Sequence, residues 1–158
     1  MKGLGTKLDG VTRKPFVLDA STAVAEGLRE RGLALLRHER LELFMSEHAW
    51  SETRHELTRR AGVIAKRHGL READAAALLA AGMAALGASV NVMPAESYAP
   101  LETVARGRLP ADPNDWPTAA LALALDTGIW TNDRDFFGSG LATWTTPVLD
   151  HYLTTESA

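Results

Sequence analysis

Cysteine is absent from this chain of 158 residues. Its absence excludes disulfide bonds, thiolate nucleophiles and zinc or iron–sulfur sites built on cysteine. Long apolar runs are also missing, because the longest, residues 75–81 and 119–125, are far too short to span a bilayer. The first fourteen residues contain no apolar signal-peptide core. We therefore expect a cytoplasmic protein that does not enter a membrane.

Several motifs that define enzyme classes are missing as well. Neither glycine-rich phosphate loop, GxGxxG or GxxxxGK[ST], occurs, and no serine stands in a nucleophile elbow. His48, Glu52 and His55 have a helical spacing that can bind zinc, but the HExxH motif is absent. A face of polar surface residues explains that spacing better.

The overall charge does not point to nucleic acid. The net charge is −3, and the apolar (46%) and charged (23%) fractions are those of an ordinary globular domain. Residues 54–71 are nevertheless locally basic, with Arg54, Arg59, Arg60, Lys66, Arg67 and Arg71. The solvated face of a helix is one explanation. A flank that contacts phosphates is the functional alternative.

Short apolar runs alternate with helical patterns along the chain. We expect a flexible arm over residues 1–14, a single domain over residues 15–150 and a tail over residues 151–158. Strands are predicted over residues 15–18, 41–45, 89–93, 128–131 and 141–145. Helices are predicted over residues 21–37 with a break at Gly32, 46–67 with Ser46 as N-cap, 71–86, 94–108 and 116–125. This alternation indicates an α/β fold with a parallel sheet covered on both faces.

Four acidic residues stand at the edges of these apolar segments: Asp19, Glu52, Asp115 and Asp133. In open α/β sheets, sites form beyond the carboxyl ends of the strands, where the strand order reverses. The acids can meet there if the first and fourth strands are neighbours. Carboxylates brought together repel one another and raise each other's pKa, and a divalent cation such as Mg²⁺ or Mn²⁺ removes that penalty.

Each acid taken alone has a simpler explanation. Asp19 and Asp115 can cap the helices that follow them, and Asp133 can be a turn residue. Glu52 can form an ion pair on the helix surface with one of two partners, His48 or Arg59. The joint placement of the four acids is what favours a metal site.

Other residues could support such a site. Ser21, Thr131 and Asn132 can orient metal ligands or metal-bound water, and Asp135 is a further or alternative ligand. Candidates for phosphate contacts are Arg54, Arg59, Arg60 and Arg134. Tryptophans that can stack on bases are Trp50, Trp116, Trp130 and Trp144, although the last two lie in predicted strands and are expected in the core.

These motifs resemble those of the PIN-domain nucleases. FVLDAST, SETRHEL, DWPTAALALAL and WTNDRDF stand in the order of that family and cover roughly residues 15–146. The resemblance implies a three-layer α/β/α sandwich with a five-stranded parallel sheet, and cleavage of RNA by water with Mg²⁺ or Mn²⁺. Carried over residue by residue, the matching acids are Asp19, Glu52, Asp115 and Asp133, with Asp135 as a fifth candidate.

The resemblance also bears on partners. Many small bacterial members are toxins of the VapC type that are held by an antitoxin protein, and we expect RNA, an antitoxin and a second copy of the chain as partners. The alanine-rich segment between residues 69 and 107 is long for a compact toxin. The motifs also resemble those of standalone bacterial PIN proteins.

Three hypotheses follow. The first is an endoribonuclease in which Asp19, Asp115 and Asp133 hold the metal, while Glu52 binds it through water or helps to deprotonate the nucleophile. The second is an RNA-binding or partner-binding PIN module without catalysis. The third, a phosphatase with Asp19 as nucleophile, is disfavoured because Ala20 and Ser21 follow where a second aspartate is needed.

Overall fold

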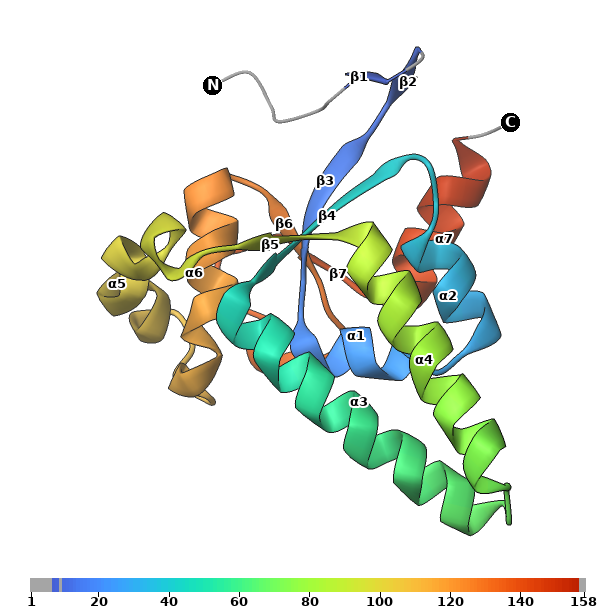
Figure 1. Cartoon of the computed structure of the whole chain (residues 1–158). Coiled ribbons are helices and arrows are strands. Elements are labelled where there is room, and N and C mark those ends of the chain that lie inside the picture. Colours follow the sequence, from blue (N-terminus) through green and yellow to red (C-terminus); the bar gives the residue numbers. More distant parts are fainter. Residues whose placement is uncertain (1–6, 9, 157–158) are drawn as a thin grey trace.

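A five-stranded sheet forms the centre of the computed structural model, which describes residues 7–8 and 10–156. Its strands are β3 (Lys14–Leu18), β4 (Leu41–Ser46), β5 (Val90–Met93), β6 (Gly128–Trp130) and β7 (Thr143–Trp144). They lie in the order β5-β4-β3-β6-β7, and every neighbouring pair is parallel (Figure 1). The five predicted strands and the parallel sheet are therefore confirmed.

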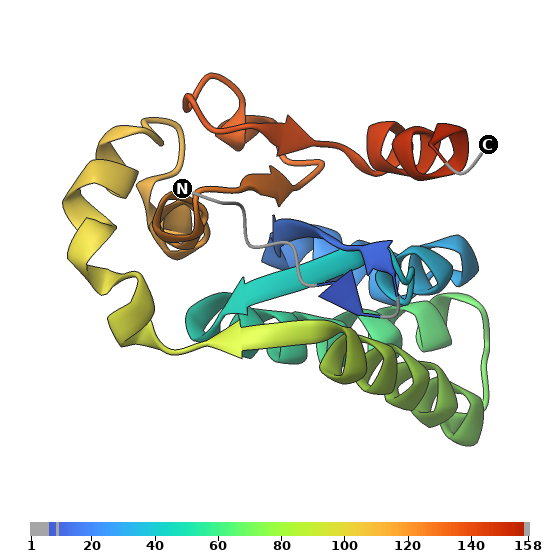
Figure 2. The ribbon, with the colours of Figure 1, turned by 90° about the horizontal axis from the view of Figure 1, so that it is seen from above.

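Helices cover both faces of this sheet. One face carries α1 (Ala20–Gly27), α2 (Glu30–Leu36), α3 (Glu47–Arg67), α4 (Glu72–Ser89) and α7 (Thr146–Thr155). The other face carries α5 (Glu102–Gly107) and α6 (Trp116–Leu125). Figure 2 shows the two groups of helices on opposite sides of the strands. The three-layer α/β/α sandwich that was expected is the fold observed.

Side chains from the strands alternate between the two layers of core. Phe16, Leu18 and Trp130 pack with the larger group of helices, whereas Val17 and Ile129 pack with α5 and α6. A strand buried on both faces needs apolar residues at every position. This is why β3 reads as the unbroken run PFVL rather than as an alternating pattern.

Strand β3 is the point at which the order of the sheet reverses. The chain first builds outward from β3 through β4 to β5, and later returns to place β6 on the other side of β3. Leu18 of β3 is in register with Trp130 of β6, and the Asp19 amide donates to the Trp130 carbonyl at 3.2 Å. The condition for convergence of the acids, neighbouring first and fourth strands, is met.

The predicted break at Gly32 is wrong. The helices α1 and α2 are separated at Leu28 and Arg29, and Gly32 lies buried inside α2. A Cβ atom at Gly32 would collide with the carbonyl oxygen of Glu26. Glycine is therefore present because α2 approaches α1 closely, not because the helix ends there.

Residues 94–108 are less regular than the single helix predicted for them. Two short 3₁₀ turns, η1 (Ala95–Ser97) and η2 (Ala99–Leu101), precede the short helix α5. Pro100 lies in the first turn of η2, where its missing N–H is tolerated. Further 3₁₀ turns, η3 (Pro113–Asp115) and η4 (Arg134–Phe136), flank α6 and β6.

Both ends of the chain contain more structure than expected. The strands β1 (Lys7–Leu8) and β2 (Val11–Thr12) form an antiparallel pair within the predicted arm, whose residues 1–6 and 9 lie outside the described part. Helix α7 continues through residues 151–155 of the predicted tail, and its Leu153 is buried in the core; residues 157–158 are not described. Among the described helices, none combines the length and apolar character that a membrane crossing requires.

Candidate active site

A cavity of about 420 Å³ opens beyond the carboxyl ends of β3 and β6. Asp19, Glu52, Asp115 and Asp133 all line it, although 114 residues of sequence separate the first from the last. The remaining lining residues are Ala20, Ser21, Val24, His55, Glu56, Arg60 and Asp112. The structure therefore brings the four predicted acids to one place, while their catalytic roles stay predictions.

Asp19 is the most deeply buried of the four acids, with 4% of its surface exposed. Its Oδ2 atom accepts hydrogen bonds from the hydroxyl groups of Ser21 (2.6 Å), Thr131 (3.1 Å) and Thr22 (3.5 Å). Burial raises the pKa of Asp19, the Ser21 and Thr131 hydroxyl groups partly offset this, and the charge of Asp133 adds to the rise. A buried, oriented carboxylate at this position gains from a cation nearby.

Asp115 stands directly before α6, where an aspartate usually caps a helix. Its side chain accepts no capping hydrogen bond from the described residues. Burial, followed by the charges of Asp19, Asp112, Asp133 and Glu52, raises the pKa of Asp115 to about 7. The capping explanation therefore does not account for this carboxylate, and the mutual repulsion expected among the acids is present.

Asp133 combines a local role with a place in the cavity. Its Oδ1 atom accepts from the backbone amide of Asp135 at 2.9 Å and so caps η4, as expected of a turn residue. Its own amide donates to Thr131 Oγ1 at 2.9 Å. Asp135 is exposed and is not among the described residues that line the cavity.

Glu52 reaches the cavity from the second turn of α3. This helix begins after Ser46, whose hydroxyl accepts from the Ala49 amide at 3.0 Å, so the predicted N-cap is confirmed. His48 Nε2 lies 3.4 Å from Glu52 Oε1, and 53% of the Glu52 side chain is exposed. Of the two surface partners considered, His48 is the one observed.

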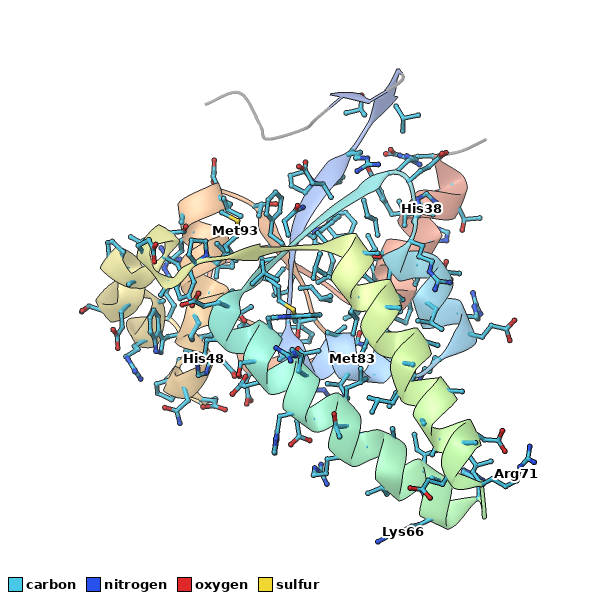
Figure 3. The ribbon with its side chains drawn as sticks, in the orientation of Figure 1. His38, His48, Lys66, Arg71, Met83 and Met93 are labelled. Atoms are coloured by element: carbon cyan, nitrogen blue, oxygen red, sulfur yellow. The ribbon has the colours of Figure 1, made fainter. Side chains whose placement is uncertain are left out.

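The predicted phosphate contacts lie at different distances from the cavity. Arg60 lines the cavity, and Arg54 lines a smaller neighbouring pocket that shares His55 with it. Arg59 is paired with Glu56 at 2.8 Å. Arg134 is exposed in η4 and is absent from the described lining. Figure 3 shows Lys66 and Arg71 at the far end of the α3–α4 helical pair, away from His48.

Glu56 and Asp112 line the cavity but were not predicted from the sequence, and His55, which also lines it, was interpreted as part of a polar helix surface. His55 and Glu56 follow Glu52 by three and four residues, which places all three on one face of α3. That spacing is a usable signal. Asp112 caps η3 through the Asn114 amide at 3.1 Å, and nothing in its spacing indicates that it faces the other acids.

Hydroxyl and amide groups connect the acids to the surrounding elements. Thr131 donates to Asp19 and accepts from the Asp133 amide, so one buried hydroxyl joins two of the acids. The hydrogen bonds described for Asn132 reach Thr22 and Thr146 rather than one of the four acids. The Asn132 amide donates to Thr22 Oγ1 at 3.0 Å, and its Oδ1 atom accepts from the Thr146 amide at 2.8 Å, which attaches the end of β6 to α1 and α7.

The donor chemistry of the cavity fits a hard divalent cation. Within residues 7–8 and 10–156, no three acidic or histidine side chains are close enough to enclose an ion as they stand. The acids that line the cavity nevertheless provide oxygen donors, and the three hydroxyl groups that donate to the Asp19 carboxylate all reach its Oδ2 atom. The raised pKa of Asp115 is the cost that a cation would remove.

Comparison with known proteins adds one match. A family model described as PIN domain matches residues 17–154, from β3 into the last helix. None of the curated proteins matches the chain.

Proposed function

The chain belongs to the PIN-domain family, whose members are generally nucleases, and from this premise we propose that it is an endoribonuclease that depends on Mg²⁺ or Mn²⁺. The observation that carries the proposal is the meeting of Asp19, Glu52, Asp115 and Asp133 in one cavity at the reversal point of the sheet. The substrate is single-stranded or structured RNA, and the expected location is the cytoplasm.

PIN domains typically use divalent metals, and Asp19, Asp115 and Asp133 are the residues that would hold one here. When bound, the cation polarises the phosphodiester and lowers the pKa of a water molecule. Ser21 and Thr131 donate hydrogen bonds to one oxygen of the Asp19 carboxylate. The carboxylate is therefore already oriented before substrate binds.

The remaining lining residues divide into two roles. A carboxylate oxygen of Glu52, which is exposed toward the cavity, accepts the proton of the attacking water. Arg60 and His55 both line the cavity and would contact the phosphates on either side of the scissile bond.

The decisive experiment measures cleavage of mixed RNA by the purified protein with Mg²⁺ or Mn²⁺, with and without a chelator. Asp19→Asn keeps the shape of the side chain and is expected to abolish cleavage. Asp74→Asn is the matched control, because Asp74 is exposed on α4 and pairs only with Arg71 among the described residues. Absence of cleavage by folded wild-type protein across varied RNAs contradicts the proposal.

A second candidate is an RNA-binding or partner-binding PIN module without catalysis. The observation that favours it is the His48–Glu52 pair, since an acid held by a surface partner is less available to the cavity. The same experiment separates the two, because the module binds RNA and leaves it intact.

The narrower form of the proposal is a toxin held by an antitoxin protein and assembled as a homo-oligomer. Co-purification with the product of an adjacent small reading frame, and loss of cleavage in that complex, would support the toxin. Light scattering of the isolated chain measures the oligomer. A monomer that cleaves RNA without any such neighbour favours a standalone nuclease.

A further inference from the structure

A second cavity, of about 290 Å³, adjoins the acid-lined cavity and has aromatic walls. Its lining residues are Glu47, His48, Ala95, Tyr98, Trp116 and Pro117, and we refer to it as the aromatic cavity. His48 lies 3.4 Å from Glu52, and Trp116 directly follows Asp115, so two lining residues are next to candidate metal-site acids. Figure 3 labels His48 at the start of α3, on the side of α6. The two cavities are therefore linked through the His48–Glu52 pair and through the adjacent residues Asp115 and Trp116.

The aromatic residues are held in place by their neighbours. Tyr98 is 2% exposed and forms the floor, with its ring centroid 5.8 Å from that of Trp116 at an interplanar angle of 56°. The Arg106 guanidinium lies 5.5 Å from the Trp116 ring and is itself fixed by Glu102 at 2.8 Å. Trp116 is among the described residues that line the aromatic cavity, and Arg106 is not.

We propose that the aromatic cavity binds one unpaired nucleobase of the RNA, preferably one with an exocyclic amino group on its Watson–Crick edge. The inference rests on the proposed function, because it places the base next to the phosphate that is cut. Single-stranded RNA is recognised by stacking unpaired bases on aromatic side chains and by hydrogen bonds to their edges. Trp116, which is half-buried, provides the surface on which the base stacks. A charged hydrogen-bond acceptor, which would bind the edge of the base, also lines the aromatic cavity.

Glu47 is that acceptor. It is exposed in the first turn of α3 and lines the aromatic cavity. An ionised glutamate accepts hydrogen bonds and donates none, so it can bind the N4 amino group of cytosine but not the O4 carbonyl of uracil. This distinguishes two pyrimidines of nearly the same size.

The first test measures binding of a cytidine hexamer without divalent metal, in an Asp19→Asn background that prevents cleavage. Trp116→Leu is expected to weaken binding roughly tenfold. Trp50→Leu is the matched control and is expected to leave affinity unchanged, because Trp50 is also partly buried but packs into the opposite core and lines neither cavity among the described residues. Thermal melting of both variants reports whether they fold.

A hexamer with abasic sites separates base binding from backbone binding. Abasic sites are expected to weaken binding to the Asp19→Asn protein and to have no further effect once Trp116→Leu is present. Equal losses of the intact and abasic hexamers on Trp116→Leu overturn the proposal, as does the absence of any loss.

The second test uses Glu47→Gln, an exposed position whose replacement leaves the aromatic wall intact. The Asp19→Asn protein is expected to bind the cytidine hexamer several-fold more tightly than the uridine hexamer. Glu47→Gln is expected to remove this preference, because an amide can donate to O4 as well as accept from N4. No preference for cytidine before the substitution contradicts the role of Glu47.

These binding measurements do not depend on catalysis. Base-dependent binding by a protein that does not cleave RNA supports the nucleobase site and contradicts the nuclease proposal. Metal-dependent cleavage with the same KM in wild type and Trp116→Leu supports the nuclease proposal and contradicts the nucleobase site.

Discussion

Asp115 is a half-buried candidate ligand that lies among several other acids. Burial and four neighbouring acids raise its pKa to about 7, so the folded protein binds a proton there that the unfolded chain releases near pH 4. Because the folded-state pKa is raised, this carboxylate makes the protein progressively less stable as the pH rises from about 4 to about 7.

Asp115→Asn is therefore expected to stabilise the metal-free protein at pH 7.5. We expect about 1 kcal/mol, since solvent screens a carboxylate that is only half-buried. Thermal melting with a chelator, at pH 7.5 and at pH 4.5, measures the effect, and the advantage of the variant should shrink at the lower pH. The same gain in Asp74→Asn, whose carboxylate pairs with Arg71 on the surface, would refute the explanation.

At the residue level, the sequence predicted the acids well and their surroundings less well. Asp19, Asp115 and Asp133 could be identified because strand ends and helix starts coincide with the ends of apolar runs in the sequence. Asp112 could not, because its contribution to the field at Asp115 depends on the 3₁₀ turn η3, which no periodic pattern marks. The choice between His48 and Arg59 as partner of Glu52 depended on side-chain directions that sequence spacing does not determine.

At the level of elements, the close packing of α2 on α1 depends on a single missing Cβ atom. Gly32 lies against the backbone of Glu26, which cannot move without shifting α1, the helix that begins directly after Asp19. A side chain at this position must push the two helices apart.

Gly32→Ala is expected to destabilise the protein by about 1–3 kcal/mol, the usual cost of overpacking. The control is Gly87→Ala in α4, where a Cβ atom would meet nothing within 4 Å, and it should instead stabilise by up to about 1 kcal/mol through helix propensity. Urea denaturation of both variants measures the difference. Equal effects of the two alanines would show that helix packing is not the cause.

Helix α3 carries the basic residues, but only one end of it reaches the cavity. Arg60 lines the cavity, whereas Lys66 lies near the last turn, at the far end of the helical pair (Figure 3). The helix thus presents a positive charge beside the acids and continues as a basic surface beyond them.

Arg60→Gln is expected to weaken binding of single-stranded RNA several-fold and to reduce the salt slope of log K by about 0.7, the value for one phosphate contact. Lys66→Gln removes the same charge away from the cavity and should change the slope less. Fluorescence anisotropy over a range of KCl concentrations, in the Asp19→Asn background, gives both slopes. Identical slopes for the two variants would indicate that the whole of α3 contacts RNA equally.

Strands could be predicted from the sequence where helices cover both of their faces. The central strands β3, β4 and β6 read as short, mainly apolar runs, because helices cover both faces of the sheet at its centre. The division of residues 94–108 into 3₁₀ turns was not predictable, since their side chains fit the edge of a core whose shape is set by α6. Gly32 misled because glycine marks a helix end and a close helix contact equally well.

For the whole molecule, a cation at the acid-lined cavity would connect elements that are distant in sequence. Asp19 follows β3, Asp115 precedes α6 and Asp133 follows β6, so one ion would join three parts of the chain. An ion that binds only the folded state raises its stability by mass action.

Addition of 5 mM Mn²⁺ is expected to raise the melting temperature of the wild type by a few degrees at matched ionic strength. The shift should be lost in Asp133→Asn and kept in Asp150→Asn, whose carboxylate pairs with Arg31 away from the cavity. Equal shifts in the two variants would mean that manganese binds elsewhere on the protein.

The central position of β3 in the sheet has a consequence for folding during synthesis on the ribosome. Synthesis proceeds from the N-terminus, and β3 is made long before its partner β6, which begins at residue 128. A nascent chain that ends before that point possesses Asp19, Glu52 and Asp115 but has no strand to carry Asp133 beside them. The acid-lined cavity therefore cannot be assembled before β6 and Asp133 have been made. The proposed nuclease activity would therefore be absent from any nascent chain that ends before β6, and such a chain would not cut the messenger from which it is translated.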